Sequence, residues 1–207
     1  MLSIKETQLK QTILNKKMFL DLDTMRLQGE LRTQEPMSRH TSWKTGGKAD
    51  YYYIASDISD LAKFICKLPT SIPITWIGFG SNLLVRDGGV SGVVVSVVGL
   101  LNELKKINET EIFIGAGVSC AKVAHFSAKH GLEGIEFLAG IPGTIGGALA
   151  MNAGAYGGEI WSYIKEVETI NRKGKREIFE KDKFDINYRS VSISENEWFI
   201  ACKMKLE

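Results

Sequence analysis

Leu138-Ala139-Gly140-Ile141-Pro142-Gly143-Thr144-Ile145-Gly146-Gly147-Ala148-Leu149-Ala150-Met151-Asn152-Ala153-Gly154-Ala155-Tyr156-Gly157 is a stretch rich in glycine and without charge. Glycine costs conformational entropy on folding and has no side chain to pack, so such a run is favoured where a backbone approaches a ligand closely. Thr144 is placed to cap a short helix, and we expect the free N–H groups of that helix to face an anion or a carbonyl-rich ring. A close contact between helices, with small residues at the seam, is the alternative interpretation.

A second glycine-rich turn lies upstream of this stretch. Gly78-Phe79-Gly80-Ser81-Asn82 follows the apolar residues 72–77, which are typical of a buried strand. Consecutive amides, a hydroxyl and a carboxamide at the end of a strand are donors that suit a diphosphate, although an ordinary hairpin turn has the same pattern. The turn lacks the third glycine and long helix of the Rossmann fingerprint, and no Gly-Lys-Ser/Thr follows as in a P-loop.

Two further motifs complete an ordered set. His40-Thr41-Ser42-Trp43-Lys44-Thr45-Gly46-Gly47-Lys48-Ala49-Asp50 precedes the turn, and Ile112-Phe113-Ile114-Gly115-Ala116-Gly117 lies between the two glycine-rich segments. In this order the motifs resemble the flavin-binding half of the UDP-N-acetylenolpyruvoylglucosamine reductase family, within the FAD-binding fold shared with vanillyl-alcohol oxidase. The resemblance runs from about residue 36 to residue 207 and is most specific over residues 134–157.

The resemblance implies a site for non-covalent FAD. The residues that it assigns to the cofactor are Gly46, Gly47, Gly78, Phe79, Gly80, Ser81, Asn82, Leu83, Gly117, Ala139, Gly140, Pro142, Gly143, Thr144, Gly146, Gly147, Ala148, Asn152, Gly154, Ala155 and Tyr156. Some proteins of the wider fold attach flavin covalently to a histidine or cysteine near the diphosphate loop, whereas this loop carries Asn82. His125 and His130 are five residues apart and do not share a helix face, so we expect no metal site.

A fifth motif points to the substrate. Phe184-Asp185-Ile186-Asn187-Tyr188-Arg189-Ser190 resembles the family's Tyr-Arg-x-Ser segment, in which the arginine holds the substrate carboxylate. A guanidinium donates two parallel hydrogen bonds to a carboxylate and stays charged when buried. We therefore expect Tyr188 and Arg189 to bind substrate, with Arg189 catalytic; without the resemblance, a solvated ion pair is the expectation for Arg189. Ser190 stands where many relatives have Asp, outside the carboxylate-binding position.

The resemblance also implies an activity. In the family, NADPH reduces FAD, and flavin N5 then gives hydride to the enolpyruvyl ether of a UDP-sugar, which yields UDP-N-acetylmuramate for peptidoglycan precursor synthesis. The C-terminal substrate domain of the family, with a serine in a Gly-Ser-Val-Phe-Lys-Asn-Pro-like segment and a late glutamate, is not present in these residues. We therefore expect a monomer that binds UDP-N-acetylglucosamine enolpyruvate and NADPH but lacks full activity alone.

Two other functions stay open. One is a flavin oxidase or dehydrogenase of the vanillyl-alcohol type, against which the lack of an attachment residue and the pair Tyr188-Arg189 both weigh. The other is a non-catalytic module that holds FAD or another nucleotide for a partner chain. The visible spectrum of the purified protein, with and without NADPH and the UDP-sugar, separates the three.

Composition excludes several classes of protein. A chain of 207 residues can bury roughly two-thirds of its unfolded surface, and its net charge of +2 argues against a dedicated nucleic-acid surface.

The basic residues 172–176 are expected to form the solvated turn of a hairpin, with a phosphate patch as the alternative. Three cysteines without Cys-x-x-Cys spacing favour a reducing compartment. No signal peptide or membrane span is visible, so we expect a cytoplasmic protein.

The pattern of elements predicts an α+β fold of two lobes, the PCMH-type FAD-binding domain. We expect a helical extension over residues 1–35 and the FAD-binding domain over residues 36–207, with lobe 1 at about 36–105 and lobe 2 at about 106–207. Lobe 1 should hold a small mixed sheet, and lobe 2 a larger, mainly antiparallel sheet with flanking helices. The expected strands are 51–54, 72–77, 92–97, 112–115, 164–170, 175–179 and 197–206, and the expected helices are 58–68 and 120–130. The flavin should lie in the cleft between the lobes.

Overall fold

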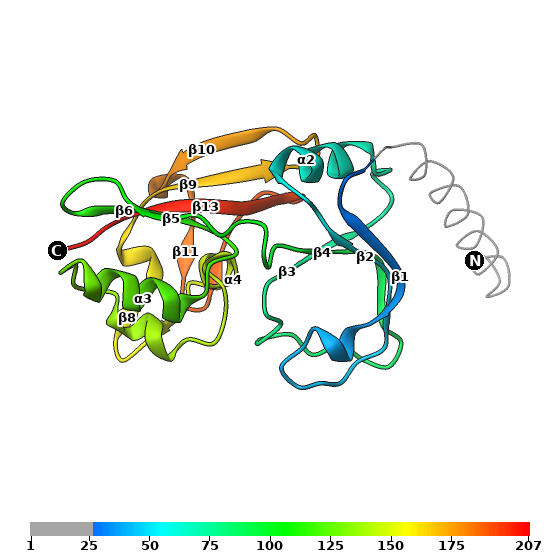
Figure 1. Ribbon diagram of the computed structural model, residues 1–207, viewed down its shortest axis with the longest axis horizontal. Coiled ribbons are helices and arrows are strands. Elements are labelled where there is room, and N and C mark those ends of the chain that lie inside the picture. Colours follow the sequence, from blue (N-terminus) through cyan, green and yellow to red (C-terminus); the bar gives the residue numbers. More distant parts are fainter. Residues whose placement is uncertain (1–26) are drawn as a thin grey trace, which may run out of the picture.

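The computed structural model describes residues 27–207 as two lobes joined side by side (Figure 1). The elements are β1 (Glu30–Pro36), η1 (Met37–Arg39), β2 (Lys48–Ile54), α2 (Ile58–Lys67), β3 (Ile74–Ile77), β4 (Val90–Ser96), β5 (Leu104–Lys106), β6 (Glu111–Gly115), α3 (Cys120–Lys129), η2 (Glu136–Gly140), α4 (Ile145–Ala150), β7 (Gly154–Ala155), β8 (Gly158–Glu159), η3 (Ile160–Ser162), β9 (Ile164–Asn171), β10 (Arg176–Glu180), η4 (Lys181–Lys183), β11 (Ile186–Asn187), β12 (Ser190–Val191) and β13 (Glu197–Lys205). The expected strands and helices therefore form, with shifts of a few residues at their ends.

The first lobe is built on a mixed sheet with the strand order β1-β2-β4-β3. β1 pairs antiparallel with β2, whereas β4 lies parallel to both β2 and β3. Because parallel strands end at the same edge of a sheet, the ends of β2, β3 and β4 meet there, and the loops that follow them gather at this edge. α2 begins at its N-cap Asp57, whose carboxylate accepts from the amide of Asp60, and it buries Leu61, Phe64 and Ile65.

The helical extension expected over residues 1–35 lies outside the described residues as far as residue 26, and its last part is wrong. Residues 30–36 form β1, an edge strand of the first sheet. Only Glu35 of this strand is buried, so the strand carries no alternation of apolar side chains from which its structure could be predicted. The first lobe therefore begins before residue 36.

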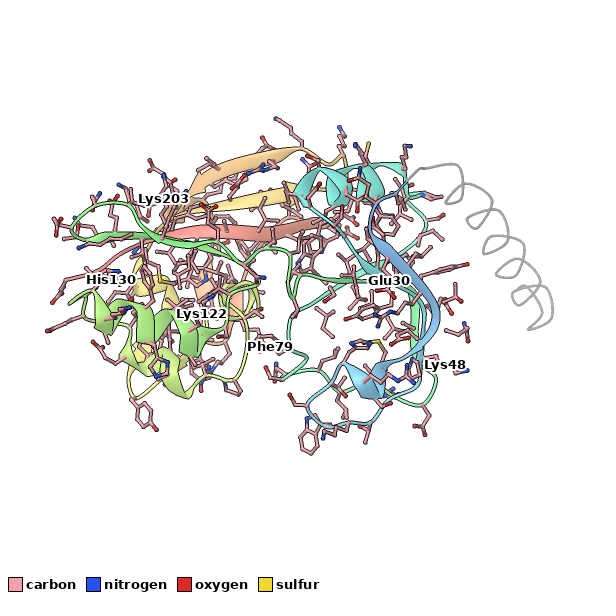
Figure 2. The ribbon with its side chains drawn as sticks, viewed as in Figure 1. Glu30, Lys48, Phe79, Lys122, His130 and Lys203 are labelled. Atoms are coloured by element: carbon pink, nitrogen blue, oxygen red, sulfur yellow. The ribbon has the colours of Figure 1, made fainter. Side chains whose placement is uncertain are left out.

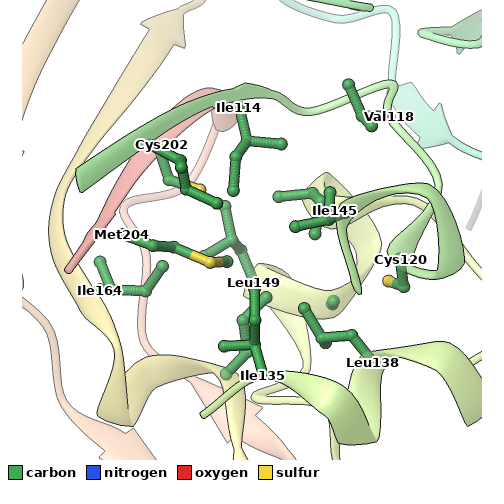
Figure 3. Close-up of a cluster of buried hydrophobic side chains, with 14 of the residues drawn as sticks. Ile114, Val118, Cys120, Ile135, Leu138, Ile145, Leu149, Ile164, Cys202 and Met204 are labelled. Atoms are coloured by element: carbon green, nitrogen blue, oxygen red, sulfur yellow. The ribbon is translucent and has the colours of Figure 1, made fainter. Parts of the chain in front are cut away.

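The second lobe is built on an antiparallel sheet with the strand order β10-β9-β13-β6-β5. α3, η2 and α4 pack on one side of it, and the buried side chains between them form a single cluster, part of which Figure 3 shows. Ile114 and Cys202 reach into this cluster from neighbouring strands, and Ile145 and Leu149 reach into it from α4. The two sheets confirm the predicted α+β class, one mixed and the other antiparallel.

The two lobes share side chains across their boundary. Ile170 and Ile200, on strands of the second sheet, are buried in the core of the first lobe together with Tyr53 and Leu61. The rings of Trp76 and Trp198 stack across the same boundary, with centroids 5.1 Å apart. The expected boundary near residue 105 falls inside β5, which belongs to the second sheet.

The basic residues 172–176 do form the turn between β9 and β10, but Arg172 is not solvated as expected. Its Nη2 donates to the carbonyl oxygens of Pro69 and Ile72 in the first lobe, at 2.6 and 2.7 Å. Burial lowers the pKa of this guanidinium. Arg172 therefore fastens the hairpin of one lobe to the loop before β3 in the other, which its sequence neighbours do not reveal.

Neither a membrane-spanning helix nor a cluster of metal-ligating side chains is found among residues 27–207. No helix among residues 27–207 is long and apolar enough to cross a membrane. The same residues hold no group of three or more histidine, cysteine or acidic side chains placed to bind a metal ion.

Candidate functional site

The turn at residues 78–82 leaves the end of β3 with its amides unpaired. Among the hydrogen bonds of the described residues, none is donated by a backbone amide of this turn. Gly80 has a φ of 64°, a left-handed conformation that glycine adopts without strain. A run of amides in such a turn makes a concave surface suited to an anion, so the turn keeps the donors that the sequence predicted for a diphosphate.

The loop at residues 39–45 packs directly on this turn. The amide of Ser42 donates to the carbonyl oxygen of Gly80 at 3.2 Å, and Thr41 Oγ1 donates to the carbonyl oxygen of Thr45 at 3.0 Å. The first of these contacts joins the two loops.

A cavity opens between these two loops and the strand ends of the first sheet. Its volume is ≈ 350 Å³, and it is lined by Arg39, His40, Thr41, Ser42, Tyr52, Ile54, Gly78, Phe79, Ser96 and Val98. The lining holds hydroxyl groups and two side chains that can carry positive charge, but no carboxylate. Figure 2 places Phe79 at the boundary between the lobes, and its side chain is half-exposed. The cavity is therefore chemically suited to a phosphate-bearing ligand.

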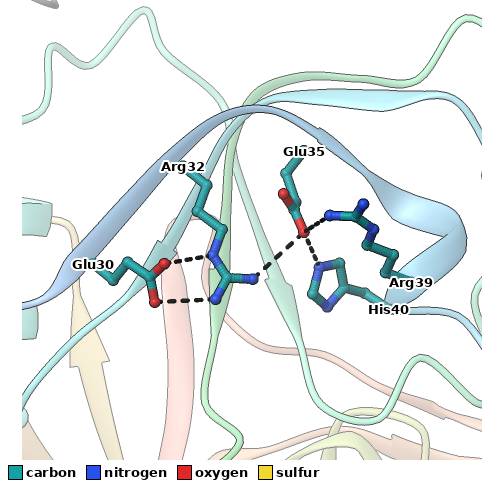
Figure 4. A network of polar contacts seen from close by, with 5 residues as sticks. All are labelled: Glu30, Arg32, Glu35, Arg39 and His40. Carbon is teal, nitrogen blue, oxygen red and sulfur yellow. Dashed lines mark hydrogen bonds and ion pairs between the residues drawn. The ribbon is translucent and has the colours of Figure 1, made fainter.

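Glu35 stands behind this cavity at the centre of a polar network, which Figure 4 shows. Its Oε1 lies 2.9 Å from His40 Nε2, 3.4 Å from Arg32 Nη1 and 3.8 Å from Arg39 Nη1. Burial acts to raise the pKa of Glu35, but the hydrogen bond from His40 and the charges around it prevail, so the pKa is lowered. Sequence reasoning missed these residues; a carboxylate five residues before a histidine is too common a pattern to single them out.

Several predicted cofactor residues are glycines whose place the neighbouring backbone already explains. A Cβ would lie 2.7 Å from Val85 Cβ at Gly46, 2.1 Å from the Asp87 carbonyl oxygen at Gly47, and 2.4 Å from the Val97 carbonyl oxygen at Gly117. Leu83 packs against the small apolar cluster of the first lobe that contains Ile77 and Val94. The contacts that require glycine at these three positions are made with the protein itself.

The second glycine-rich segment contains the capped helix that the sequence predicted. Thr144 Oγ1 accepts from the amide of Gly147, and α4 runs for six residues after this cap. The expectation that the first amides of α4 are free is wrong. The amide of Ile145 donates to the carbonyl oxygen of Val118, and that of Gly146 donates to Ala116, each at 2.9 Å. These amides are hydrogen-bonded to the residues that follow β6, so they are not open to a ligand.

The two interpretations of this segment apply to different glycines. At Gly146 a Cβ would lie 2.9 Å from Ala116 Cβ, which is the close contact between small residues. At Gly140, Gly143 and Gly147 a Cβ would meet no atom closer than 3.8, 3.4 and 3.8 Å, and none of the three has a positive φ. Neither packing nor backbone conformation requires glycine there, so open space beside the backbone is what these residues provide. Ala148 lies in the core.

The two glycine-rich segments meet at the boundary between the lobes. A Cβ at Gly78 would lie 2.4 Å from Thr144 Oγ1, and a Cβ at Gly143 would lie 3.4 Å from Ser81 Oγ. Asn82 Nδ2 lies 2.9 Å from Met151 Sδ. The structure thus brings together the residues that the sequence assigned to one site from positions more than sixty apart.

Asn152 is buried and hydrogen-bonded within the second lobe. Its side chain is 1% exposed, and Nδ2 donates to Glu159 Oε2 at 2.9 Å and to the carbonyl oxygen of Asn187 at 3.1 Å. It therefore joins the turn that carries Gly154, Ala155 and Tyr156 to the β11–β12 hairpin. The predicted cofactor residue Asn152 acts in the structure as a link within the second lobe.

Arg189 lies at the tip of the β11–β12 hairpin beside that turn. Its Nη2 donates to the carbonyl oxygen of Gly154 at 2.8 Å, and its φ is 55°. Tyr188 is 81% exposed and Tyr156 is 96% exposed, so both rings are available to a ligand or to another part of a protein. The structure brings Arg189 and Tyr188 close to the predicted cofactor residues 154–156.

The remaining predicted residues surround these. Ala139 and Gly140 end η2, and Pro142 and Gly143 connect η2 to the cap of α4. The carbonyl oxygen of Gly143 accepts from the amide of Cys120, which orders this connection against α3.

Free amides, open glycines and a cavity free of carboxylates are together the features of a protein that binds an anionic, nucleotide-like ligand. Residues 49–179 match the family described as "FAD binding domain", and the chain belongs to that family.

The chain is similar in sequence to UDP-N-acetylenolpyruvoylglucosamine reductases. It is 47% identical over 180 residues to the enzyme of Nitrosococcus oceani and 48% identical over 179 residues to that of Legionella pneumophila. These matches cover 87% and 86% of this chain, and 60% and 58% of the two relatives. The chain thus spans about 60% of their length and corresponds to their FAD-binding part. The resemblance inferred from the motifs is confirmed.

Solved structures agree in fold. The crystal structure of UDP-N-acetylenolpyruvylglucosamine reductase from Thermus caldophilus superposes with a TM-score of 0.72 at 27% identity, and covers 87% of this chain and 63% of its own. The 6-hydroxy-D-nicotine oxidase of Arthrobacter nicotinovorans superposes with a TM-score of 0.61 at 16% identity, over 88% of this chain and 43% of its own. The second likeness concerns the fold alone.

Proposed function

We propose that this chain is the FAD-binding module of a UDP-N-acetylenolpyruvoylglucosamine reductase, which reduces the enolpyruvyl ether with NADPH to give UDP-N-acetylmuramate for peptidoglycan synthesis. The observation that carries the proposal is the contact of the turn at residues 78–82, whose amides are unpaired, with Gly143 and Thr144 of the segment that also holds the open glycines 140 and 147. The similarity to curated reductases supports the choice of reaction.

The residues present fit FAD. The amides of residues 78–82 would hold its diphosphate, and the cavity beside them has hydroxyl and cationic groups but no carboxylate. The open backbone at Gly140, Gly143 and Gly147 leaves room for a flat ring to approach. Bound FAD would supply the hydride-transfer chemistry.

Arg189 and Tyr188 are the proposed substrate residues. The exposed tip of the hairpin leaves donors of Arg189 free for a carboxylate, since the only hydrogen bond it makes in the described chain is with Gly154. We propose that the enolpyruvyl carboxylate binds there, with Tyr188 beside it. In this proposal the protein acts as a cytoplasmic monomer.

The visible spectrum of the purified protein tests the cofactor. We expect a flavin spectrum, and acid precipitation should release the colour into the supernatant because no attachment residue lies in the loop of Asn82. Colour that stays with the precipitate favours the covalent-oxidase alternative. A protein that neither retains nor takes up FAD excludes the proposal.

Consumption of NADPH tests the reaction. We expect the flavin-loaded chain to be reduced by NADPH, but not to turn over the enolpyruvyl UDP-sugar, because the serine and glutamate that the family carries in its C-terminal substrate domain are not in the 207 residues. General acid–base groups typically contribute about 10²–10⁴ in rate. Substrate-dependent turnover within tenfold of a longer relative would place the chemistry in residues other than those proposed. Bound flavin that NADPH does not reduce favours the non-catalytic alternative.

A further inference from the structure

Glu35 is a carboxylate that the fold buries at some cost. Its side chain is 7% exposed, and it lies on β1, an edge strand whose other residues are half-buried or exposed. Removing a carboxylate from water is unfavourable unless charged or hydrogen-bonding partners compensate. Here the compensation comes from His40 at 2.9 Å, with Arg32 and Arg39 further out. The buried carboxylate of Glu35 therefore holds the imidazole of His40 in place.

His40 is held from a second side by an aromatic ring. Its ring stacks on that of Tyr52, with centroids 4.1 Å apart and planes 23° apart. Tyr52 and Ser96, at the end of the neighbouring strand, line the same cavity. With Nε2 bound to Glu35 and one face on Tyr52, the imidazole has a single orientation.

His40 is also the residue on which the turn at 78–82 rests. A Cβ on Gly80 would lie 2.1 Å from the carbonyl oxygen of His40, and the amide of Ser42 donates to the carbonyl oxygen of Gly80. The backbone at His40 therefore positions both the imidazole of His40 and the turn whose amides are unpaired.

His40 and Arg39 give the cavity its positive side. They line it together with the hydroxyl-bearing residues Thr41, Ser42 and Ser96, and Glu35 is not part of the lining. Because Nε2–H of His40 is donated to Glu35, a negative ligand in the cavity favours the imidazole that also carries a proton on Nδ1. The charged and titratable groups in contact with His40 are Glu35 from β1 and Tyr52 from β2, and Glu35 is in turn paired with Arg32 from β1 and Arg39 from η1.

We propose that His40 contacts the phosphates of FAD and that Glu35 is the positioning residue that holds it for this contact. The inference rests on the proposed function and deepens it, because it adds a cationic wall to the amides of residues 78–82. Neither residue is among those that the resemblance assigned to the cofactor, although His40 is the first residue of the motif that contains Gly46 and Gly47.

The test measures the affinity of the purified, flavin-free chain for FAD by isothermal titration calorimetry between about pH 5 and pH 8, the range in which histidine titrates. For the wild type we expect affinity to rise as the pH falls. His40→Gln should bind FAD about tenfold more weakly at the lower pH, the loss of one hydrogen bond to a charged group, and should have a flat pH profile. Glu35→Gln should lower affinity at every pH, since the neutral amide oxygen accepts from His40 Nε2 more weakly than the carboxylate does and holds the imidazole less firmly.

Two matched variants separate positioning from stability. Arg32→Gln removes another partner of Glu35 but does not change the cavity lining, and His130→Gln removes a histidine of the second lobe, at the end of α3. Both should bind FAD within twofold of the wild type and keep its pH profile. Circular dichroism confirms the fold of each variant; if Glu35→Gln does not fold, the pH profile of His40→Gln decides.

The outcomes are distinct. A wild-type chain that binds no FAD overturns the proposed function and this inference with it. A wild type that binds FAD, with His40→Gln showing unchanged affinity and pH profile, overturns the inference alone. Arg32→Gln that weakens binding as much as His40→Gln shows a merely structural network and also overturns it.

Discussion

The carbonyl oxygen of His40 lies where a side chain on Gly80 would begin: a Cβ built on Gly80 would be 2.1 Å from it. This contact, together with a φ of 64°, explains why residue 80 is glycine before any ligand is considered. A diphosphate-binding turn is commonly described by what it offers to the ligand. In this protein the turn is shaped first by the loop behind it.

Gly80→Ala is expected to weaken FAD binding by about tenfold or more. The new Cβ displaces the 39–45 loop, and a left-handed alanine is strained by about 1–3 kcal/mol. Calorimetric titration with FAD measures the effect. Gly131→Ala is the matched control, because Gly131 has a φ of 66° and no atom within 4 Å of its Cβ position, so it introduces the same strain without the clash. Equal FAD affinity in the two variants would contradict the prediction.

Gly147→Ala is expected to stabilise the protein and yet weaken FAD binding. Glycine inside a helix is less favourable than alanine by roughly 0.5–1 kcal/mol, and the nearest atom to the new Cβ is 3.8 Å away. Gly146→Ala, one residue earlier, should instead destabilise the protein, because its Cβ meets Ala116 Cβ at 2.9 Å. Urea unfolding and FAD titration of both variants check this. Unchanged FAD affinity of a stabilised Gly147→Ala protein would show that the open space is not used by the cofactor.

Asn152→Ala is expected to lower the free energy of unfolding by about 1–3 kcal/mol, because the carbonyl of Asn187 and the carboxylate of Glu159 lose a buried donor. The φ of Asn152 is 42°, so alanine also meets backbone strain. Asn152→Gly loses the same hydrogen bonds without that strain and should be less destabilised. Chemical denaturation compares them, and equal stability of the two variants would mean that the backbone angle carries no cost.

Stability is expected to fall in acid because of Asp60. This carboxylate is buried and accepts from the Tyr53 hydroxyl and from the amides of Gln28 and Ser56. Burial acts to raise the pKa of Asp60, but these hydrogen bonds outweigh it, so the pKa is lowered.

A lowered pKa in the folded state means that the stabilisation is complete above the unfolded value, about 3.9, and is lost as the pH falls through the folded value. Asp60→Asn should therefore reduce the free energy of unfolding at pH 7, and its difference from the wild type should shrink below about pH 4. Urea unfolding at a series of pH values measures this. A difference that stays constant into acid would contradict the assignment.

Much of the fold was predictable because its signals are local. The helix at residues 58–67 has its apolar side chains on one face and an aspartate at its cap, and the strands of the second sheet are separated by recognisable turns. β1 was missed because its pairing with β2 depends on the partner strand and on little in its own residues.

The candidate site was predictable as a set of segments, and less so as a set of contacts. The sequence shows that residues 138–157 are rich in glycine, but it does not distinguish Gly146, which packs on Ala116, from Gly147, which faces open space. It also does not reveal that the first amides of α4 are already paired, or that Arg172 binds carbonyls of the other lobe. Each of these depends on which distant backbone lies alongside, and that is decided by the tertiary structure.

The shared core at the lobe boundary has a consequence for how such proteins change by recombination. Ile170 and Ile200 belong to one sheet by hydrogen bonding but to the other lobe by burial, and Trp198 stacks on Trp76 across the same line. The two lobes should consequently melt as one cooperative unit. If one lobe is exchanged for that of a relative, Ile170, Ile200 and Trp198 must stay with the first lobe, whose core they fill. A crossover placed between the two sheets would remove them and leave that core open to water.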